Sequence, residues 1–571
     1  MMFDISKVPF SRYGSYFSLS INDWGPLGTG LYLRAHYGKS PMVFRIDPVR
    51  DGQVLAYDTE ASPSLLKLTA AGGGDVEFVI SGDGTARLRG RGVSLRLEMP
   101  AERWTWAYQI PGAWAFNYSP CQFQLALDML RGDLDVVAPW RKGKGFCYET
   151  THAVMTLSGD AEGCFEAAID DFLTTWIKPE RATFDTCREA VAREYAEWTR
   201  GLPEVGGGDA AACDLAAYVN WSAVVNPAGY VTRPAMYMSK MGMCNVYNWD
   251  NVFNAMAHCA HRPGLAWDQL LIMADHQDTY GKSPSSMNRN EIRMTITNSP
   301  IHGWGLRYMR AANPGLLTPE RRAEAYDYLS RWTEWIRTCR VWPGDRLPFH
   351  HHGFDGGWDN ASIFDQGVPV ITPDYAAYTI LQMEVLSDLA KELGRAEEAV
   401  VWNRRAEDML TALVEDLWRD DRFIGILRPS GKAVFCDSLL ICMPLVLGTR
   451  LPEDVRTHLV ARVKDHLTPH GLATEKLDSP AYVEGGYWRG PIWAPSTMLI
   501  TSGLIEIGEA ELARTIMRAF CDMCAENGFY ENFDPITGKG YYDTAYTWTS
   551  SVFMMFARML HGNSPTSGEE G

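Results

Sequence analysis

Residues 318–340 read TPERRAEAYDYLSRWTEWIRTCR, and this stretch decides the fold class because its apolar residues recur with the period of an α-helix. Thr318 can cap the first turn with its hydroxyl oxygen, and Pro319 takes the first helical position, where no backbone donor is needed. One face of this helix collects Ala325, Tyr328, Leu329, Trp332 and Ile336. The stretch therefore predicts an amphipathic helix that packs on a core.

The same pattern continues through the C-terminal two thirds of the chain. A second Thr-Pro start at 372–373 leads into Ile380 and Leu386. About twelve such helices fit within residues 182–560, joined by loops rich in Gly, Pro and Asn. No strand pattern of comparable strength alternates with them, and no repeat is visible in the sequence. An even set of helices without βαβ units favours antiparallel helical hairpins arranged around a centre.

The first 175 residues have the pattern of β-strands instead. Short segments with alternating apolar residues, such as VEFVI, SLRLEM and HAVMTLS, stand between turn signals such as AAGGGD and SGDGT. This spacing predicts a β-sandwich. We therefore expect a β-sandwich domain at 1–175, a linker helix region at 176–205, a helical catalytic domain at 206–562 and a disordered tail at 563–571.

Composition and charge restrict the class of partner. The 571 residues include 53 Lys and Arg against 70 Asp and Glu, which gives a net charge of −17. Such a chain repels nucleic acid and anionic membrane surfaces. Twenty Trp, 25 Tyr and 22 Phe suit pockets for ring-shaped ligands such as sugars, although a large aromatic core would also use them. We expect a small neutral or cationic ligand, and a homo-oligomer is compatible with the sequence.

Cysteine usage and the N-terminal residues favour the cytoplasm. Twelve Cys are scattered between Cys121 and Cys524 without the spacing of a disulfide framework. Cys521 and Cys524 form a CxxC, but no second pair stands at metal-site spacing, so we expect no metal and no cofactor. The triplet at His350–His352 is interpreted as a surface loop. The start, MMFDISKVPFSRYG, lacks the pattern of a secretory signal, and no apolar stretch is long enough to span a bilayer.

Residues 355–362 read DGGWDNAS and raise the question of whether Asp359 forms a turn or acts as an acid. Asp and Asn beside Gly are typical of turns. Trp358, however, would keep water away from Asp359 and raise the pKa of its carboxyl group. In FYENFDP, Glu531 offers a second carboxylate, with a solvated loop glutamate as the plain alternative. As a pair, one carboxyl group would protonate a leaving oxygen while the other activates a water across a sugar ring.

Two more motifs combine aromatic rings with charged groups. YNWDNVF contains Asp250, which could cap the following helix and also bind a hydroxyl, and Trp249, which suits a pocket wall. GGYWRGPIW contains Arg489. This arginine either stacks between Trp488 and Trp493 or donates hydrogen bonds to sugar hydroxyls and tunes neighbouring carboxylates.

In this order, YNWDNVF, GGWDNAS, GGYWRGPIW and FYENFDPITG resemble the signature segments of glycoside hydrolase family 63 and its relatives. These include processing α-glucosidases, mannosylglycerate and glucosylglycerate hydrolases and, more distantly, trehalases. GYWRGPIW is the most specific segment, and the resemblance covers about residues 215–560. It implies an (α/α)6 barrel that cleaves an α-glycosidic bond with inversion. The expected fold is therefore mainly α, an (α/α)6 barrel preceded by an N-terminal β-sandwich.

The resemblance also implies roles for individual residues. Asp359 matches the general acid of the family and Glu531 its general base. The residues expected to line the site for the terminal sugar are Trp249, Asp250, Trp358, Asn360, Tyr487, Trp488, Arg489, Trp493 and Trp548. The chain departs from the pattern where Asp355, Gly356 and Gly357 replace Glu-Ser-Gly, and a PGGRF-type segment of strict trehalases is missing. Trehalose is therefore a disfavoured substrate.

Together these features predict an inverting, exo-acting α-glycosidase that releases glucose or mannose from a small glycoside or short oligosaccharide. Inversion predicts a separation of about 6.5–9.5 Å between the carboxyl groups of Asp359 and Glu531. One alternative is a sugar epimerase or polysaccharide lyase on the same helical toroid, which would use His or Tyr at the centre. The other is a carbohydrate-binding protein that holds sugars without cleaving them.

Overall fold

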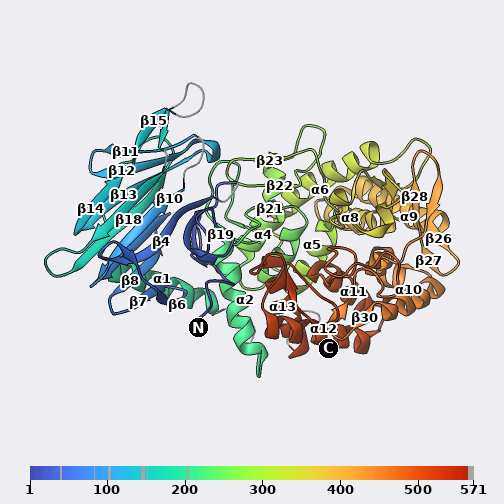
Figure 1. The fold of residues 1–571 in the computed structure, drawn as a ribbon. Helices are drawn as coiled ribbons and strands as arrows, with labels where there is room; N and C mark the ends of the chain where they lie inside the picture. The colour runs from blue at the N-terminus through green and yellow to red at the C-terminus, as the bar shows by residue number, and fades with distance from the viewer. Residues whose placement is uncertain are drawn as a thin grey trace. The chain divides into compact units, whose positions relative to one another are not determined.

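The chain forms two compact units, which Figure 1 shows from blue at the N-terminus to red at the C-terminus. Unit 1 consists of 1–202, 217–245 and 288–291, and unit 2 of 203–216, 246–287 and 292–571. In this computed structural model the described residues are 1–38, 41–82, 84–100, 104–142, 148–150, 152–200, 202 and 205–562. The tail expected at 563–571 lies outside them. The domain boundaries expected at residues 175 and 206 stay a prediction.

Two antiparallel sheets make up most of unit 1 (Figure 1), and each has eight strands within the described residues. The first has the order β1-β2-β3-β4-β10-β17-β14, with β5 on β4. Its strands are Phe10–Ser11, Phe17–Asn22, Gly30–Ala35, Met42–Arg50, Ser94–Met99, Ala153–Ser158, Asp133–Val137 and, for β5, Gln53–Val54. The second has the order β11-β12-β13-β18-β9-β8-β7-β6. Its strands are Thr105–Ile110, Ala113–Tyr118, Phe123–Arg131, Cys164–Phe172, Thr85–Arg91, Asp75–Ser81, Leu65–Ala70 and Tyr57–Ser62.

The two sheets face each other across an apolar core. Alternate residues of β10 and β17 are buried, as expected for strands with one face on a core. Phe44 of β4 and Phe116 of β12 meet edge to face, with ring centroids 5.0 Å apart. The Tyr118 hydroxyl, also on β12, donates a hydrogen bond of 2.9 Å to the carbonyl oxygen of Val43 on β4. The expected N-terminal β-sandwich is therefore confirmed.

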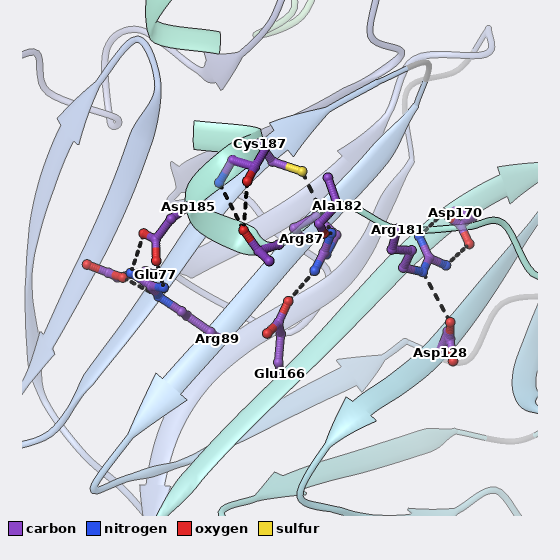
Figure 2. Close-up of polar contacts among 12 residues, drawn as sticks. Glu77, Arg87, Arg89, Asp128, Glu166, Asp170, Arg181, Ala182, Asp185 and Cys187 are labelled. Atoms are coloured by element: carbon purple, nitrogen blue, oxygen red, sulfur yellow. Dashed lines mark hydrogen bonds and ion pairs between the residues drawn. The ribbon is translucent and has the colours of Figure 1, made fainter. Parts of the chain in front are cut away.

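Ion pairs attach helix α1 (Phe184–Thr199) and the segment before it to the second sheet, as Figure 2 shows. Arg181 lies 2.5 Å from Asp170 of β18 and 3.2 Å from Asp128 of β13. Arg89 of β9 lies 3.1 Å from Asp185, in the first turn of α1. Asp128 is fully buried, so its charge needs these cationic partners. These ion pairs thus fix α1 and the segment before it on the polar face of the second sheet.

Six helical elements of unit 2 form a closed inner ring, counted over the described residues. In order around the ring they are α3 (Asp250–His258), α5 (His302–Ala312), α8 (Pro373–Glu392), η4 (Leu439–Arg450), α11 (Ala494–Glu506) and α13 (Thr547–Leu560). Each packs on the next, and α13 packs on α3 to close the ring. Five further helices lie against this ring: α4 (Pro263–Leu271), α6 (Pro319–Cys339), α9 (Ala396–Leu417), α10 (Glu453–Asp465) and α12 (Ala510–Asn527).

Burial separates the inner helices from the outer ones. In the inner helix α8, 16 of 20 residues are buried, whereas in the outer helix α6 only 8 of 21 are. A helix that is apolar on all sides needs neighbours on all sides, and an amphipathic helix needs only one. The predicted helix at 318–340 is confirmed as α6, and the Thr318 hydroxyl accepts a hydrogen bond from the backbone of Arg321. The division between the units falls within α2 (Asp209–Ala223).

Short antiparallel strands cross the connections between these helices. Those near the predicted motifs are β21 (Val246–Tyr247), β22 (Ser286–Met287), β24 (Phe349–His350), β25 (Val370–Ile371), β32 (Asn532–Phe533) and β33 (Gly540–Tyr541). In the pair β32–β33, Asn532 lies opposite Tyr541. The motifs therefore lie on connections that backbone pairing holds in place.

The expected description of the fold as mainly α is wrong. Strands account for about 27% of the residues and helices for about 38%. The helical barrel is present, but the two large sheets of unit 1 and the short strands between the helices carry the additional β-structure. The strong helical periodicity of the C-terminal part led to an underestimate of the strand content.

Candidate active site

The predicted site residues lie where the chain enters the inner helices. Asp250 is the first residue of α3, Trp493 directly precedes α11, and Trp548 is the second residue of α13. Asp359 lies on the connection between α7 (Gly353–Gly356) and β25, ahead of α8, and Glu531 directly precedes β32. Four separate motifs of the sequence thus reach the N-terminal ends of inner helices, which the ring brings together.

Five buried tryptophans connect these motifs. Trp488 and Trp493 stack in parallel, with centroids 4.1 Å apart, and Trp358 lies 4.5 Å from Trp488. Trp249 and Trp548 meet edge to face at 6.3 Å, and Trp548 lies 5.5 Å from Trp493. Because Trp488 and Trp493 stack on each other, Arg489 does not lie between them. These five rings, which we call the tryptophan wall, connect the segments that carry the carboxyl groups.

Three carboxyl groups of the site act on one another. Asp250 and Glu531 are each 4% exposed, and Asp359 is half-buried. Burial raises the pKa of Asp359 to about 6 and that of Glu531 to about 7. Burial also raises the pKa of Asp250 well above its usual range, and the charges of Asp359 and Glu531 raise it further. Neighbouring carboxyl groups that titrate near neutral pH suit general acid–base chemistry.

Tyr487 contacts Glu531 directly. Its hydroxyl donates a hydrogen bond of 2.8 Å to the Glu531 Oε1 atom, which favours the ionised carboxylate and lowers the pKa of Glu531 against the effect of burial. Burial and the nearby carboxylates raise the pKa of Tyr487 far above its usual range, so the hydroxyl keeps its proton. The residue has a left-handed backbone with φ of +64°, which is strained for a side chain of this size.

The loop that carries Asp359 is anchored at its start. Asp355 is buried and accepts hydrogen bonds from the backbone N–H groups of Thr297 (3.1 Å) and His351 (2.9 Å). The guanidinium of Arg340 lies 3.4 Å from the same carboxylate. At Gly357 φ is +73°, and a Cβ atom there would come within 2.4 Å of the Trp249 ring. The glycine lets the loop approach Trp249 closely.

Arg489 and Asn360 hold two motifs together. The Asn360 side chain donates to the carbonyl of Gly486 (3.0 Å) and accepts from the backbone of Trp488 (2.9 Å). Arg489 donates to the carbonyl of Asn360 (2.8 Å) and forms a two-point ion pair with Asp365. These contacts fix the connection that carries Asp359 against the GGYWRGPIW segment.

The structure thus brings together the residues that the sequence nominated, while two neighbours were missed. The backbone N–H of Glu531 bonds to the carbonyl of Asp543 at 2.8 Å, and the Asp543 charge raises the pKa of Glu531. Tyr542 packs edge to face on Tyr487 at 5.3 Å. Both lie in YYDTAYTW (541–548), which combines aromatic rings with a carboxylate as the four motifs do. That composition was the available signal.

The CxxC cysteines and one of the three consecutive histidines belong to the core. Cys521 and Cys524 are buried on α12, and burial raises the pKa of both thiols well above the usual range. Within the described part of the chain, no group of three or more His, Cys, Asp and Glu residues could hold a metal ion. The surface-loop interpretation is wrong for His350, which is fully buried and stacks on Tyr375 at 4.4 Å. His351 and His352 are exposed as expected.

A helical barrel with titrating carboxyl groups inside a tryptophan wall is suited to protonating a leaving group at a sugar ring and activating water. Fold and site define a glycoside hydrolase. The chain belongs to glycoside hydrolase family 63: the family model described as "Mannosylglycerate hydrolase MGH1-like glycoside hydrolase domain" matches residues 243–549, more than half of the chain.

Known proteins resemble the chain in sequence and in fold. A mannosylglycerate hydrolase of Rubrobacter radiotolerans is 29% identical over 437 residues, which cover 60% of this chain and 96% of the relative. A family 63 mannosylglycerate hydrolase of Thermus thermophilus, solved with glucose, superposes with a TM-score of 0.51 at 20% identity over 59% of this chain and 98% of that one. A bacterial glucoamylase solved with acarbose reaches a TM-score of 0.66 at 10% identity over 98% and 94%. These structures show the shared fold.

Proposed function

We propose that this glycoside hydrolase is an exo-acting α-glycosidase that inverts the configuration at the anomeric carbon, with Asp359 as general acid and Glu531 as general base. The observation that carries the proposal is the pair of carboxyl groups, on separate motifs, that interact electrostatically inside the tryptophan wall. Burial gives both a pKa near neutrality, about 6 and about 7.

The reaction requires one proton on the pair of carboxyl groups, and Asp359 carries it. Asp359 donates its proton to the glycosidic oxygen, and the bond between that oxygen and the anomeric carbon breaks. Ionised Glu531 takes a proton from a water molecule, and the water oxygen forms the new bond from the opposite face. The products are the free sugar of inverted configuration and the leaving alcohol. Asp359 ends ionised and Glu531 protonated. Glu531 must therefore release a proton and Asp359 must take one up before the next turnover.

The remaining site residues set the surroundings of the two carboxyl groups. The buried tryptophan rings at positions 249, 358, 488, 493 and 548 keep water away from the segments that carry the carboxyl groups. Burial and the neighbouring carboxyl groups raise the pKa of Asp250 and so favour its protonated form, which can both donate to and accept from sugar hydroxyls. The hydrogen bond from Tyr487 favours the ionised form of Glu531 and so partly offsets the rise in pKa that burial causes. Asn360 and Arg489 stabilise the loop that carries Asp359 rather than binding the sugar.

The sugar released is glucose or mannose, from a small glycoside or oligosaccharide. The curated relative from Rubrobacter radiotolerans is named a mannosylglycerate hydrolase, and a related structure was solved with glucose. The chemistry requires no cofactor. None of the helices in the described residues is both long and apolar enough to cross a membrane. A cytoplasmic location and a homo-oligomer stay predictions.

The proposal is tested by incubating the purified chain with α-glucosides and α-mannosides and following free sugar. Release of glucose or mannose is the expected result. A product that keeps its glycosidic bond but changes a stereocentre, or gains a double bond, would favour an epimerase or a lyase. Tight binding without any product would favour a carbohydrate-binding protein.

A further inference from the structure

Glu475 is a fully buried carboxylate that has no part in the proposed chemistry. It lies on the connection between β31 (Gly471–Leu472) and the GGYWRGPIW segment. Burial raises the pKa of its carboxyl group, because the ionised form loses its contact with water. A buried carboxylate costs free energy unless hydrogen bonds satisfy its oxygens. Its hydrogen-bond partners therefore indicate what this glutamate does.

Both carboxylate oxygens of Glu475 accept hydrogen bonds from serines. The Ser362 hydroxyl donates to Oε2 at 2.7 Å, and the Ser479 hydroxyl donates to Oε1 at 2.6 Å. The backbone of Glu475 pairs with that of Ser438, the residue directly before η4. Ser362 belongs to DGGWDNAS and stands three positions after Asp359. Glu475 thus links the segment of the proposed acid to two other segments of unit 2.

The surroundings of Glu475 suit an acceptor rather than a reacting acid. Each serine hydroxyl has one proton to donate, and the two serines donate to different oxygens, as an ionised carboxylate allows. These bonds and the positive charge of Arg489 lower the pKa of Glu475 against the larger effect of burial, whereas Asp437 raises it. Because the side chain is 0% exposed, it cannot contact a substrate, and any effect on the reaction passes through its partners.

The residues that follow the proposed general acid are held at three points. Arg489 donates from Nε to the carbonyl oxygen of Asn360 at 2.8 Å and forms the two-point ion pair with Asp365. Between these two contacts, the bond from Ser362 to Glu475 holds the middle of the segment. Two points leave a short segment free to turn about the line that joins them, and a third point prevents this turn. Glu475 supplies the third point.

We propose that Glu475 is a positioning residue for the acid step: through Ser362 it holds the segment that follows Asp359, and so sets the direction in which the Asp359 carboxyl group meets the leaving oxygen. Proton transfer in the transition state depends steeply on this geometry. The inference rests on the proposed function, because it concerns the proton that Asp359 donates. Loss of the contact should weaken protonation of the leaving group and spare the activation of water by Glu531.

The first test uses Ser362→Ala on two substrates of the wild type, an α-glucoside or α-mannoside with an alcohol leaving group and the α-fluoride of the same sugar. Fluoride leaves without a proton, so its hydrolysis does not need the acid. The variant is expected to lower kcat for the glycoside by about 10-fold to 100-fold, and kcat for the fluoride by no more than about twofold, with little change in KM.

Two results of this test would overturn the inference and leave the proposed function standing. An equal loss on glycoside and fluoride would show general damage to the barrel, and no loss on either would show that the contact does not position the acid. If the wild type cleaves neither substrate, the proposed function fails, and the inference fails with it. Asp359→Asn is the reference, and it should show the same preference for the fluoride more strongly.

The second test substitutes Glu475 itself. Glu475→Met has no acceptor and should show the selective loss of Ser362→Ala, and the double variant should lose no more than the larger single loss, because both changes break one link. Glu475→Gln can accept from one serine and donate to the other, so it should stay within about threefold of the wild type. Additive losses in the double variant, or a Gln variant as impaired as Met, would contradict positioning through Ser362.

The matched control is Ser387→Ala. It removes another buried serine hydroxyl of unit 2, which lies on α8 and donates to the carbonyl oxygen of Ala399 at 2.9 Å. This bond does not touch the segment after Asp359, so both substrates should be cleaved at the wild-type rate. A selective loss on the glycoside in this variant as well would contradict the specific role of Ser362 and Glu475.

Discussion

Asp359 and Glu531 carry the proposed chemistry, so each should be indispensable on its own. Asp359→Asn and Glu531→Gln are each expected to lower kcat by between about 100-fold and 10,000-fold, the usual contribution of a general acid or base. KM should change little, because each substitution keeps the size of the side chain and removes only its ability to transfer a proton. Steady-state kinetics on a cleaved α-glycoside measures the effect. Glu484→Gln, which neutralises an exposed carboxylate just before the GGYWRGPIW segment, should keep full activity. Wild-type rates in both site variants would refute the assigned roles.

The pKa values also predict the pH dependence. With Asp359 at about 6 and Glu531 at about 7, kcat/KM should follow a bell with limbs near those values, and the pair titrates as a unit. A single shared proton then resides mostly on Glu531. The reactive form, with the proton on Asp359, is about one tenth of the singly protonated enzyme. Activity rises as pH passes about 6 and falls above about 7.

Tyr487→Phe tests this order of protonation. Because the Tyr487 hydroxyl lowers the pKa of Glu531, its removal should move the alkaline limb to higher pH by about one unit and reduce the maximum of kcat/KM about tenfold. A profile of kcat/KM measured from pH 4 to 10 tests this prediction. An alkaline limb that moves down, or a lower rate with unchanged limbs, would show that the hydrogen bond does not control Glu531.

A buried carboxyl group with a raised pKa costs stability once it is ionised. The pKa of Glu531 is about 7 against an ordinary value of 4.5, so the folded state loses stability as pH rises through 7. Glu531→Gln removes this cost and should raise the free energy of unfolding at pH 8 by on the order of 3 kcal/mol, at about 1.4 kcal/mol per pKa unit. At pH 4.5 the gain should be small. Denaturant titration at both values measures it, and an equal gain at both would contradict the linkage.

For individual residues, the sequence predicted which side chains belong to the site but not which side chains they contact. Composition and motif order brought Asp359 and Glu531 forward, and the structure has them act on each other. The bond from Tyr487 to Glu531, the pairing of Arg489 with Asp365 and the neighbourhood of Asp543 depend on loops that meet only after folding. The burial of His350 was missed because three consecutive histidines suggested solvent, whereas His350 lies on β24, both of whose residues are buried, and His351 and His352 follow the strand.

Among the helices, close approach can be tested with glycine. Gly303 of α5 faces α8, and a Cβ atom there would lie 2.5 Å from the Cα atom of Gln382. Gly303→Ala should cost about 1–3 kcal/mol of stability, because the backbone of α8 has to move. Gly264→Ala in the outer helix α4 is the matched control, since nothing lies within 4 Å of its Cβ position, and it should stabilise the chain by about 0.5–1 kcal/mol. Thermal unfolding compares the two, and equal shifts would contradict the close packing.

Individual helices were predictable where local rules act alone. α6 begins at Pro319 behind the Thr318 cap and buries the face read from its period. η4 was harder to predict from the sequence, because it consists of 3₁₀ turns that include Pro444. Its ten buried residues pack against neighbours on several sides. Two-residue strands such as β32 and β33 carry no periodic signal, since their pairing is set by chain segments on either side of a turn.

For the whole molecule, the change from a strand period to a helix period along the chain predicted a two-part organisation. It did not predict the fractions of helix and strand. Strands of alternating residues, as in β10 and β17, are short and individually weak signals, and the long helices outweighed them in the prediction of a mainly α fold. The closure of α13 on α3 depends on contacts between residues about 300 positions apart. The helical pattern favoured hairpins arranged around a centre, and the resemblance to known sequences specified the (α/α)6 barrel.

The central claim is that Asp359 and Glu531 cleave an α-glycosidic bond with inversion. Proton NMR during the first minutes of hydrolysis of an α-glycoside, before the free sugar equilibrates between its anomers, tests it most directly. The account predicts that the β-anomer appears first, and that Asp359→Asn and Glu531→Gln release neither anomer at a comparable rate. Initial release of the α-anomer would contradict it, because retention requires a covalent intermediate and carboxyl groups only about 5 Å apart.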